Sequence, residues 1–564
     1  MTTQIWFDAP GFPQTLADLL LAGTLGRDHL LRAAAMAQAA GEKTPNIADW
    51  PRLRRQLLAA ALEEDPLYGP TAAALTKALR ATPPGRIDPA FTALVETVAA
   101  RFRPPESVAY FERLLTGGNV GRIDAYLENE IRNSRAALFW LHIALHRAIL
   151  GRDFDRAAAL AELALSGDLT PLGHKVAGDL ALLRGDAPAA LAAYDAAQAL
   201  APWPAGMFRH PLAALAAGRE DLAATALADL LRLMPEHVSA GLALYDLASG
   251  RRRRLGRLTG DLCVALYTFN KADDLDKTLA SLFASDFSVV DGAVRMLLLD
   301  NASSDATPDV IAAWAGRVGN ERLAAIRLPV NIGAPAARNW LTSDDQLAQG
   351  AHVAYLDDDV DLPADWLARL ATAAEAYPEA GVWGCRVMDA ANPAIAQGVD
   401  AMLLPPEPGQ EEPQLSGLHA QGFDFGGFAH LRPCLTVMGC CHLFRRERLL
   451  GAGGFDIRFS PSQYDDVDHD WRLALAGRPP VYQGHLAVAH RRPAPALARQ
   501  RPDQLAGGQA NWQKLAAKHA GRYAAMAAAQ RETAASDLRR KFEELAGAGP
   551  GPGAASSAGT TSRV

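Results

Sequence analysis

The chain has 564 residues, of which 49% are hydrophobic and 21% are charged, and its formal net charge is −7. This composition is typical of globular proteins, the length allows about two to four domains, and the mild acidity gives no reason to expect a nucleic-acid partner. The sequence has no run of about 18 apolar residues, and its start lacks the basic end and apolar core of a signal peptide, so we expect a cytoplasmic protein without a membrane span.

The first half of the chain has the apolar spacing of helices. Residues 1–135 are rich in Ala and Leu but too irregular to assign beyond a helical region. Within residues 136–250, Gly151, Gly185 and Gly218 lie 34 and 33 residues apart, and each would end one helix before the next begins. This punctuation resembles the tetratricopeptide repeat, although the family's large aromatic positions are mostly absent. Stacked repeats build concave surfaces, so we expect a groove for a polypeptide or partner protein, with a helical cap on the second half as the alternative.

A basic linker, residues 251–260, follows the helical half. It holds five arginines in the seven residues from Arg251 to Arg257. Such a run could contact phosphate, but a solvated connection between two domains is the simpler interpretation.

Residues 261–492 alternate apolar strands with helices. The predicted strands cover 262–269, 295–300, 323–328 and 353–356. Continuous apolar runs predict parallel strands covered on both faces, and the βαβα order predicts a Rossmann-like domain. The expected fold class is therefore an α-helical solenoid followed by an α/β domain with a mostly parallel sheet. Ligands of such domains bind at the carboxyl ends of strands, where each predicted strand runs into a polar cluster.

Three consecutive carboxylates, Asp357, Asp358 and Asp359, directly follow the strand 353–356. Adjacent like charges repel, and their burial is costly unless a cation shares the site. A hard divalent cation such as Mg²⁺ or Mn²⁺ would relieve the repulsion and hold a substrate phosphate in its remaining positions. An acidic surface turn is the alternative interpretation.

Seven short motifs occur in order along residues 261–492. They are Thr268, Asn270 and Lys271; Asp300, Asn301, Ser303 and Asp305; Asn331, Gly333, Arg338 and Asn339; Asp357 and Asp359; the segments 438–446 and 453–456; Asp465, Asp466, Asp468 and Arg472; and His490. Together they resemble family 2 glycosyltransferases of the GT-A fold. The resemblance implies transfer of a sugar from a nucleotide-diphosphate sugar, with bound Mn²⁺ or Mg²⁺ stabilising the charge of the leaving diphosphate.

By this resemblance, Asp359 is expected to bind the metal directly, and Asp357 to bind the ribose or to reach the metal through water. Asp358 is expected to contribute to donor binding. His490 is expected to supply a further metal ligand, with His485 as the competing assignment and a structural strand-end role as the alternative.

The turns at the other strand ends are expected to bind the donor nucleotide. Asp300 would accept a hydrogen bond from the ring NH of the nucleobase, with capping of the next helix as its alternative role. Thr268 would lie against the same base, and Arg338 would meet a phosphate or an acidic partner. The remaining expected donor contacts are the turn residues Asn270, Asn301 and Gly333.

Displacement at the anomeric carbon needs a base on the face opposite the leaving group. The resemblance assigns that role to Asp466. Asp465 is the alternative base. The family more often has Glu at this position, and the replacement by Asp shortens the reach of the carboxylate by one methylene, so this residue is not excluded. Asp468 is expected to orient a neighbour or to pair with Arg472, four residues further along a helix. Direct attack by an activated hydroxyl would invert the anomeric configuration, an expectation taken from the family.

Three segments lie outside these motifs. The insert 389–432, with its glycine-aromatic run Gly422–Phe428, is expected to be either a lid over the sugar or a passive surface loop. A helical extension is expected over 493–546. Residues 547–564 are rich in Gly, Ala, Ser and Thr and are expected to be disordered.

The leading functional hypothesis is an inverting glycosyltransferase whose helical half presents a protein acceptor, such as flagellin. A second hypothesis gives the enzyme a saccharide or lipid-linked acceptor in cell-surface polysaccharide synthesis, with the repeats binding a partner. A catalytically dead scaffold is the third, and the intact Asp357, Asp359 and Asp466 argue against it. The sugar, the nucleotide base, the acceptor and the oligomeric state are left open.

Overall fold

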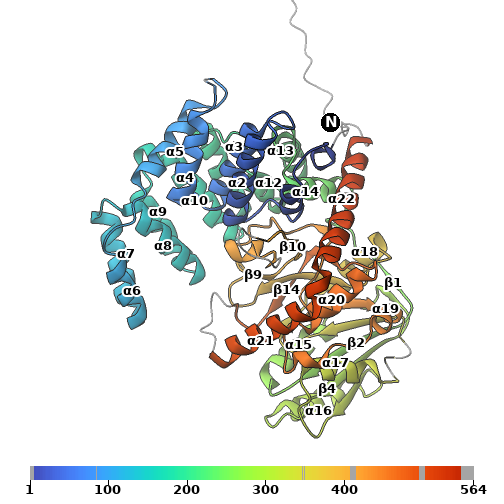
Figure 1. Cartoon of the computed structure of the whole chain (residues 1–564). Coiled ribbons are helices and arrows are strands. Elements are labelled where there is room, and N and C mark those ends of the chain that lie inside the picture. Colours follow the sequence, from blue (N-terminus) through green and yellow to red (C-terminus); the bar gives the residue numbers. More distant parts are fainter. Residues whose placement is uncertain are drawn as a thin grey trace, which may run out of the picture.

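The computed structural model describes residues 5–83, 85–345, 347, 350–406, 414–494 and 502–547. An all-helical half lies against a half built on a β-sheet (Figure 1). The tail after Gly547 that was expected to be disordered, and residues 407–413 of the insert, lie outside the described residues. None of the helices described is long and apolar enough to cross a membrane.

The first half consists of helices joined by short polar breaks. The helices are α1 (Gln14–Leu21), α2 (Arg27–Lys43), α3 (Trp50–Glu64), α4 (Gly69–Arg80), α5 (Pro89–Arg101), α6 (Val108–Gly117), α7 (Val120–Asn133), α8 (Ala137–Leu150), α9 (Phe154–Ala164), α10 (Thr170–Leu183), α11 (Ala187–Leu200), α12 (Arg209–Ala216), α13 (Glu220–Leu233) and α14 (Val238–Ala248). Side chains in the breaks start several of them: Asp153 and Asp186 each accept a backbone N–H from the first turn of α9 and α11.

The second part of the helical half is consistent with a helical-repeat region. The pairs α8–α9, α10–α11 and α12–α13 pack against each other. Gly185 and Gly218 adopt φ angles of 82° and 71°, the left-handed conformation in which glycine ends a helix without strain. At the first break, Arg152 takes this conformation instead of Gly151. The regular glycine spacing therefore marks helix ends, as predicted.

The second half is built on a mixed sheet with a parallel core. Its strands are β2 (Leu262–Thr268), β4 (Val294–Asp300), β5 (Leu323–Arg327), β6 (His352–Leu356), β7 (Val360–Asp361), β8 (Trp383–Asp389), β9 (Ala396–Gly398), β12 (Leu431–Pro433), β13 (Cys441–Arg445) and β14 (Val481–His490). Among the described residues their order is β12-β14-β8-β13-β6-β2-β4-β5, with β7 beside β14 and β9 beside β8. The four predicted strands are β6, β2, β4 and β5, which are mutually parallel, so the predicted fold class is confirmed. β13 inserts antiparallel between β6 and β8.

Helices cover both faces of this sheet. The helices of this half are α15 (Ala272–Phe283), α16 (Thr307–Val318), α17 (Ala334–Thr342), α18 (Trp366–Ala376), α19 (Arg446–Gly451), α20 (Asp465–Leu475), α21 (Pro502–His519) and α22 (Tyr523–Gly547). Leu262, Val264 and Leu266 of β2 belong to the core cluster that includes residues of α15, α16 and α18, whereas Cys263 and Ala265 belong to a second cluster that includes residues of α17 and extends to the helical half. Burial on both faces explains the unbroken apolar run of β2.

The insert 389–432 packs between the two halves. The Oε1 atom of Gln421 accepts hydrogen bonds from the backbone N–H groups of Asp28 and His29, at the start of α2. The guanidinium of Arg209, in α12, lies 3.6 Å from the ring centroid of Phe425. The glycine-aromatic run therefore contributes to the interface between the halves, a role that neither the lid nor the passive loop described.

The linker and the C-terminal helix make further connections. Arg252 and Arg254 of the basic linker pair with Glu220 of α13 and Glu375 of α18, at 3.2 Å and 2.7 Å. Helix α22 runs along both halves (Figure 1), and it packs against α1, α14, α20 and β12. The two halves are thus joined along several separate segments.

Candidate functional site

The predicted polar turns lie along one edge of the sheet. Thr268 lies opposite Asp300 in the register of β2 and β4. Leu266 of β2 lies opposite Leu356, the last residue of β6, and Asp357 follows directly. Because neighbouring parallel strands end at the same edge, these side chains share the edge at which ligands of α/β domains bind.

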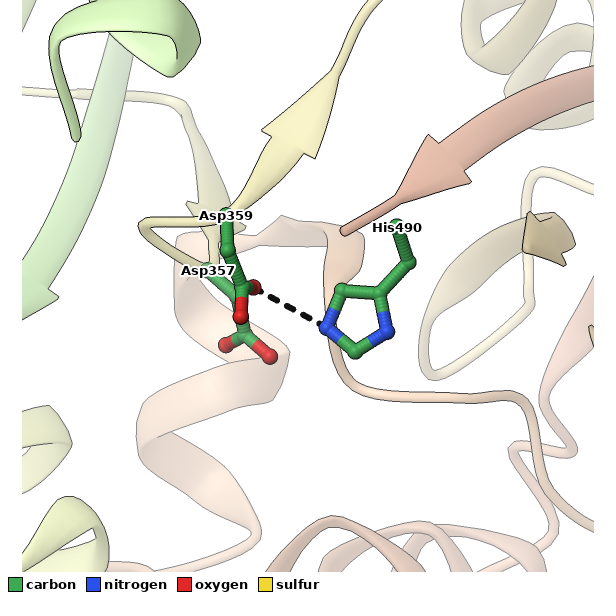
Figure 2. Close-up of side chains that lie close together, drawn as sticks. All are labelled: Asp357, Asp359 and His490. Carbon is green, nitrogen blue, oxygen red and sulfur yellow. Dashed lines mark ion pairs between the residues drawn. The ribbon is translucent and has the colours of Figure 1, made fainter. Parts of the chain in front are cut away.

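Asp357, Asp359 and His490 form a carboxylate–histidine cluster at this edge. One ligand atom from each of the three lies within 4.8 Å of the others, and His490 Nε2 is 3.0 Å from Asp359 Oδ1. Figure 2 shows the imidazole pointing toward both carboxylates. Asp359 and His490 are buried, while Asp357 is half-buried. Two carboxylates and an imidazole are a donor set that fits a divalent cation such as Mn²⁺.

A hydrogen bond at Nδ1 fixes the orientation of the His490 ring. Its Nδ1 lies 2.8 Å from Gln397 Oε1, and Gln397 in turn donates from Nε2 to Asp389 Oδ2 at 2.9 Å. Because the amide nitrogen of Gln397 is committed to a carboxylate, its oxygen must accept the Nδ1 proton of His490. The hydrogen bond to Asp359 needs a proton on Nε2 as well, so the ring is an imidazolium here. Loss of the Nε2 proton would leave a lone pair on that nitrogen for a cation, as in many metal sites.

The three carboxylates of the acidic turn differ in pKa. Burial raises the pKa of Asp357 to about 6 and that of Asp358 to about 7. Burial would also raise the pKa of Asp359, but the hydrogen bond from His490 and the Lys271 ammonium outweigh it and lower that pKa. Lys271 Nζ lies 2.9 Å from Asp359 Oδ2. Asp359 is therefore ionised at the centre of the group, which suits a direct cation ligand.

His485, the competing candidate, points elsewhere. Its Nε2 lies 2.8 Å from Asp246 Oδ2, on α14 of the helical half. A register shift in β14 between Gln483 and Ala487 separates it from His490. His485 is therefore part of the interface between the halves, and the structure places only His490 of the two beside the acidic turn.

Arg338 connects the cluster with the second acidic motif. Its Nη1 lies 2.6 Å from Asp465 Oδ2, and its Nη2 lies 3.4 Å from Asp357 Oδ1 and 3.4 Å from the carbonyl oxygen of Gly439. Both Arg338 and Asp465 are buried. Of the two partners expected for Arg338, the structure supplies the acidic one. Asp465 is thereby occupied by an ion pair.

Asp466 has a different environment from its neighbour. It is half-buried, and its Oδ2 accepts a hydrogen bond from the backbone N–H of Gly439 at 2.9 Å. A Cβ atom at position 439 would lie 2.7 Å from this Oδ2, so only glycine allows the approach. Asp468, one turn along α20, pairs with Arg472 at 3.0 Å, which is one of the two roles expected for it.

Asp300 holds the turn after β4 and does not cap the following helix. Its Oδ1 accepts from the backbone N–H of Ser303 at 2.8 Å. Its Oδ2 is buried, has no hydrogen-bond partner among the described residues, and lies 3.4 Å from Arg327 Nε. The cap of α16 comes from Asp305, whose Oδ1 accepts from Thr307 N at 3.0 Å. One oxygen of Asp300 therefore stays available to a base NH.

The remaining predicted donor contacts shape the turns. Asn301 Oδ1 accepts from Ile332 N at 2.9 Å, which ties the turn after β4 to the segment before α17. Asn270 adopts a φ of 51°, and its side chain accepts from Ser304 N at 2.8 Å. Gly333 has a φ of 81°, and a Cβ there would lie 2.9 Å from Ser460 Oγ. These residues hold the backbone of the edge.

Sequence reasoning missed two residues that hold site residues in place. Gln397 lies in the insert, and Asn511 lies in α21, where its side chain reaches the loop before α20. Both are isolated polar residues outside any motif, so no sequence signal could have identified them.

The comparison with protein families gives one match. Residues 263–449 match the family model described as Glycosyl transferase family 2. This range includes the turns after β2, β4 and β6 and ends before α20. No match was found among curated proteins.

Solved structures give distant likenesses. The mannosyltransferase PcManGT from Pyrobaculum calidifontis, in complex with GDP-Man and Mn²⁺, is 18% identical over 58% of this chain and 87% of its own, with a TM-score of 0.35. GalNAc-T7 with UDP, GalNAc and Mn²⁺ is 11% identical over 47% of this chain and 48% of its own, with a TM-score of 0.33. S. aureus TarS is 15% identical over 41% of this chain and 36% of its own, with a TM-score of 0.29. This chain thus spans about half the length of GalNAc-T7, and at these scores the likenesses carry no conclusion about activity.

Proposed function

We propose that the chain, whose residues 263–449 match the model of glycosyl transferase family 2, is a metal-dependent enzyme that moves a sugar from a nucleotide-diphosphate sugar to an acceptor hydroxyl. The proposal rests on one observation: the carboxylate–histidine cluster and the second acidic motif are in contact through Arg338. Arg338 contacts both Asp357 and Asp465, so the two acidic motifs, far apart in sequence, share one site.

Each group at this edge has a role that its environment supports. A divalent ion held by the cluster would act as a Lewis acid toward the leaving diphosphate. Lys271 adds a positive charge beside Asp359 and is placed to contact the same diphosphate. Asp300 accepts from the ring NH of the base through Oδ2, which has no hydrogen-bond partner among the described residues. Asp466 takes the proton of the acceptor hydroxyl, and attack opposite the leaving group inverts the anomeric configuration.

A protein acceptor, of which flagellin is an example, is the first candidate. A hollow of about 440 Å³ lies between α9, α10 and α11, lined by small residues such as Ala161, Gly173 and Ala177, with Glu162 and Arg184 beside them. A hollow of this size accommodates side chains of a bound polypeptide. The helical half would then hold the acceptor protein while the sheet-containing half modifies it.

A saccharide acceptor, free or lipid-linked and used in polysaccharide synthesis, is the second candidate. One observation favours it: the half-buried rings of Tyr464 and Trp512 lie 5.6 Å apart, and Tyr464 directly precedes Asp465 and Asp466 in the chain. Aromatic faces beside a carboxylate suit a sugar ring, because the rings pack against its CH groups while the carboxylate accepts from a hydroxyl.

The proposed activity is tested with a panel of UDP- and GDP-sugars in the presence of MnCl₂. Release of nucleoside diphosphate that is lost on chelation and in Asp359→Asn supports the proposal, and an inactive wild type over the whole panel overturns it. The helical half should not be deleted in such tests, because Phe208 and Leu212 of α12 share a core cluster with Val353 of β6.

Two further variants distinguish the acceptors. Ala177→Arg fills the hollow and should reduce transfer to a protein acceptor recovered with the enzyme. Trp512→Ala should reduce transfer to added methyl glycosides and oligosaccharides. Ala177→Arg should leave the metal-dependent hydrolysis of the donor unchanged, and Trp512→Ala should leave the Kd of UDP or GDP in MnCl₂ unchanged.

A further inference from the structure

We infer that Asn511, in the C-terminal extension, is a positioning residue for the base of the transfer reaction. The inference rests on the proposed function, because it takes Asp466 as that base. Asn511 lies beyond the residues 263–449 that match the family model, so its role would be specific to chains that carry this extension.

The side chain of Asn511 forms hydrogen bonds with several backbone atoms of the loop before α20, residues 459–464. It is 3% exposed, and its Nδ2 donates to the carbonyl oxygens of Phe459 and Ser462, both at 2.9 Å, with that of Gln463 at 3.4 Å. Its Oδ1 accepts from Lys514 Nζ at 2.9 Å. A buried amide that donates to backbone carbonyls of a loop fixes the path of that loop, because moving the loop would leave the buried donor without a partner.

The loop needs an external support because its backbone is strained. Gln463 and Tyr464 adopt φ angles of 81° and 70°, a region that residues with a side chain rarely occupy, least of all bulky ones. Such conformations persist only where the surroundings enforce them, and they concentrate at functional sites. The hydrogen bonds of Asn511 and the packing of Trp512 on Tyr464, with 5.6 Å between ring centroids, supply that support.

The strained loop leads directly into the acidic motif. Tyr464 precedes Asp465, the first residue of α20, and Asp466 follows. A change in the path of the loop would therefore tilt the start of α20 and move the Asp466 carboxylate relative to Gly439 N, which now lies 2.9 Å from its Oδ2. Misplacement of a catalytic group by about 1 Å costs about 100-fold in rate.

Helix α21 also holds α20 itself. His519 Nε2 and Lys518 Nζ lie 2.8 Å and 2.6 Å from Asp468 Oδ1, one turn after the start of α20. The same helix thus contacts the segment before Asp466 and the segment after it. Contacts on both sides of Asp466 would hold its carboxylate in position. The contacts of α21 described above do not involve Asp357, Asp359 or His490.

The test compares Asn511→Asp with Gln513→Ala. Aspartate has nearly the shape of asparagine but cannot donate to the carbonyls, whereas Gln513 is exposed on the same helix and serves as the matched control. We expect Asn511→Asp to lower kcat for donor turnover by about 100-fold. The Kd of UDP or GDP in MnCl₂, measured by calorimetry, should stay within about twofold, because Asn511 contacts none of the cluster residues. Gln513→Ala should match the wild type in both measurements.

Hydrogen exchange separates this inference from the proposed function. In Asn511→Asp, exchange should rise in peptides covering 459–467 and stay unchanged in β2, β4 and β6. Wild-type kcat in a folded Asn511→Asp variant, or exchange that rises throughout the domain together with a weaker Kd, would overturn the inference.

If the wild type turns over none of the nucleotide sugars, the proposed function fails. The local rise at 459–467 then still decides whether Asn511 holds the loop, and Asn511→Ala repeats the measurement should the aspartate variant not fold.

Discussion

Arg338 and Asp465 form a buried ion pair, with Nη1 and Oδ2 2.6 Å apart, and this pair gives two adjacent aspartates different roles. Asp465 is 2% exposed and neutralises the guanidinium, while Asp466 is half-buried and bound by one backbone N–H. A base must reach the acceptor hydroxyl and exchange its proton, so Asp466 suits the role that the sequence left open between the two.

The two aspartates should therefore respond differently to substitution. Asp466→Asn should lower the transfer rate by about 10²- to 10⁴-fold, the usual contribution of a general base, while calorimetry finds unchanged binding of UDP or GDP with MnCl₂. Asp465→Ala leaves a buried arginine without its main partner and should lower the free energy of unfolding in urea by about 3–5 kcal/mol. A stable Asp465→Ala with no activity, beside an active Asp466→Asn, would reverse the assignment.

The metal should depend on His490 and not on His485. His490→Gln removes an imidazole whose Nε2 lies 3.0 Å from Asp359, and it should weaken Mn²⁺ binding measured by calorimetry at least as much as the about 10- to 100-fold loss typical of outer-sphere partners. His485→Gln is the matched control on the same strand. It breaks the contact with Asp246 and should lower stability while Mn²⁺ affinity stays at the wild-type value. Equal losses of Mn²⁺ affinity in both variants would contradict the cluster.

Much of the fold could be predicted because its signals are local. The apolar run of β2 is continuous since Leu262 and Cys263 face different covered sides of the sheet, and this pattern is visible without any partner. β13 was not predicted, because it is antiparallel to β6 and β8 and such pairing depends on residues far apart in sequence.

The site was predictable where carboxylates follow strands and not where long-range contacts decide. Asp357 and Asp359 are recognisable from their place after an apolar run. His485 and His490 could not be separated, because a register shift in β14 disturbs the alternation of side chains between them. Gln397, which fixes the His490 ring, comes from the insert and has no signature in sequence.

Stability should fall in mild acid because of His469. This residue of α20 is fully buried, stacks on Phe455 with 4.6 Å between centroids, and has no hydrogen-bond partner for either ring nitrogen among the described residues. Burial, with the nearby charge of Arg472, lowers its pKa to about 3. The unfolded chain binds the proton near pH 6.5 and the native state does not, so stability is lost as pH falls from about 6.5 toward 3.

Urea unfolding at pH 7 and pH 5 measures this contribution. Between those values His469 should account for about 2 kcal/mol of lost stability, from about 1.5 pH units at 1.36 kcal/mol each. His469→Leu removes the titrating group and keeps an apolar side chain against Phe455, so its loss between pH 7 and pH 5 should be smaller by that amount. An identical pH dependence in the wild type and the variant would show that His469 is not the cause.

The insert should behave as packing between the halves and not as a lid. Arg209, which is buried, lies 3.6 Å from the ring centroid of half-buried Phe425, and residues of both halves line the space beside this contact. Phe425→Ala should lower the free energy of unfolding by about 2 kcal/mol, the value for a desolvated cation–π contact, with KM for the donor and the ratio of transfer to hydrolysis unchanged. Leu255→Ala, at a residue 54% exposed in the linker, is the control for loss of an apolar side chain and should leave stability unchanged. A lid would give the opposite result, because opening it admits water to the sugar: Phe425→Ala would then raise hydrolysis relative to transfer at nearly constant stability.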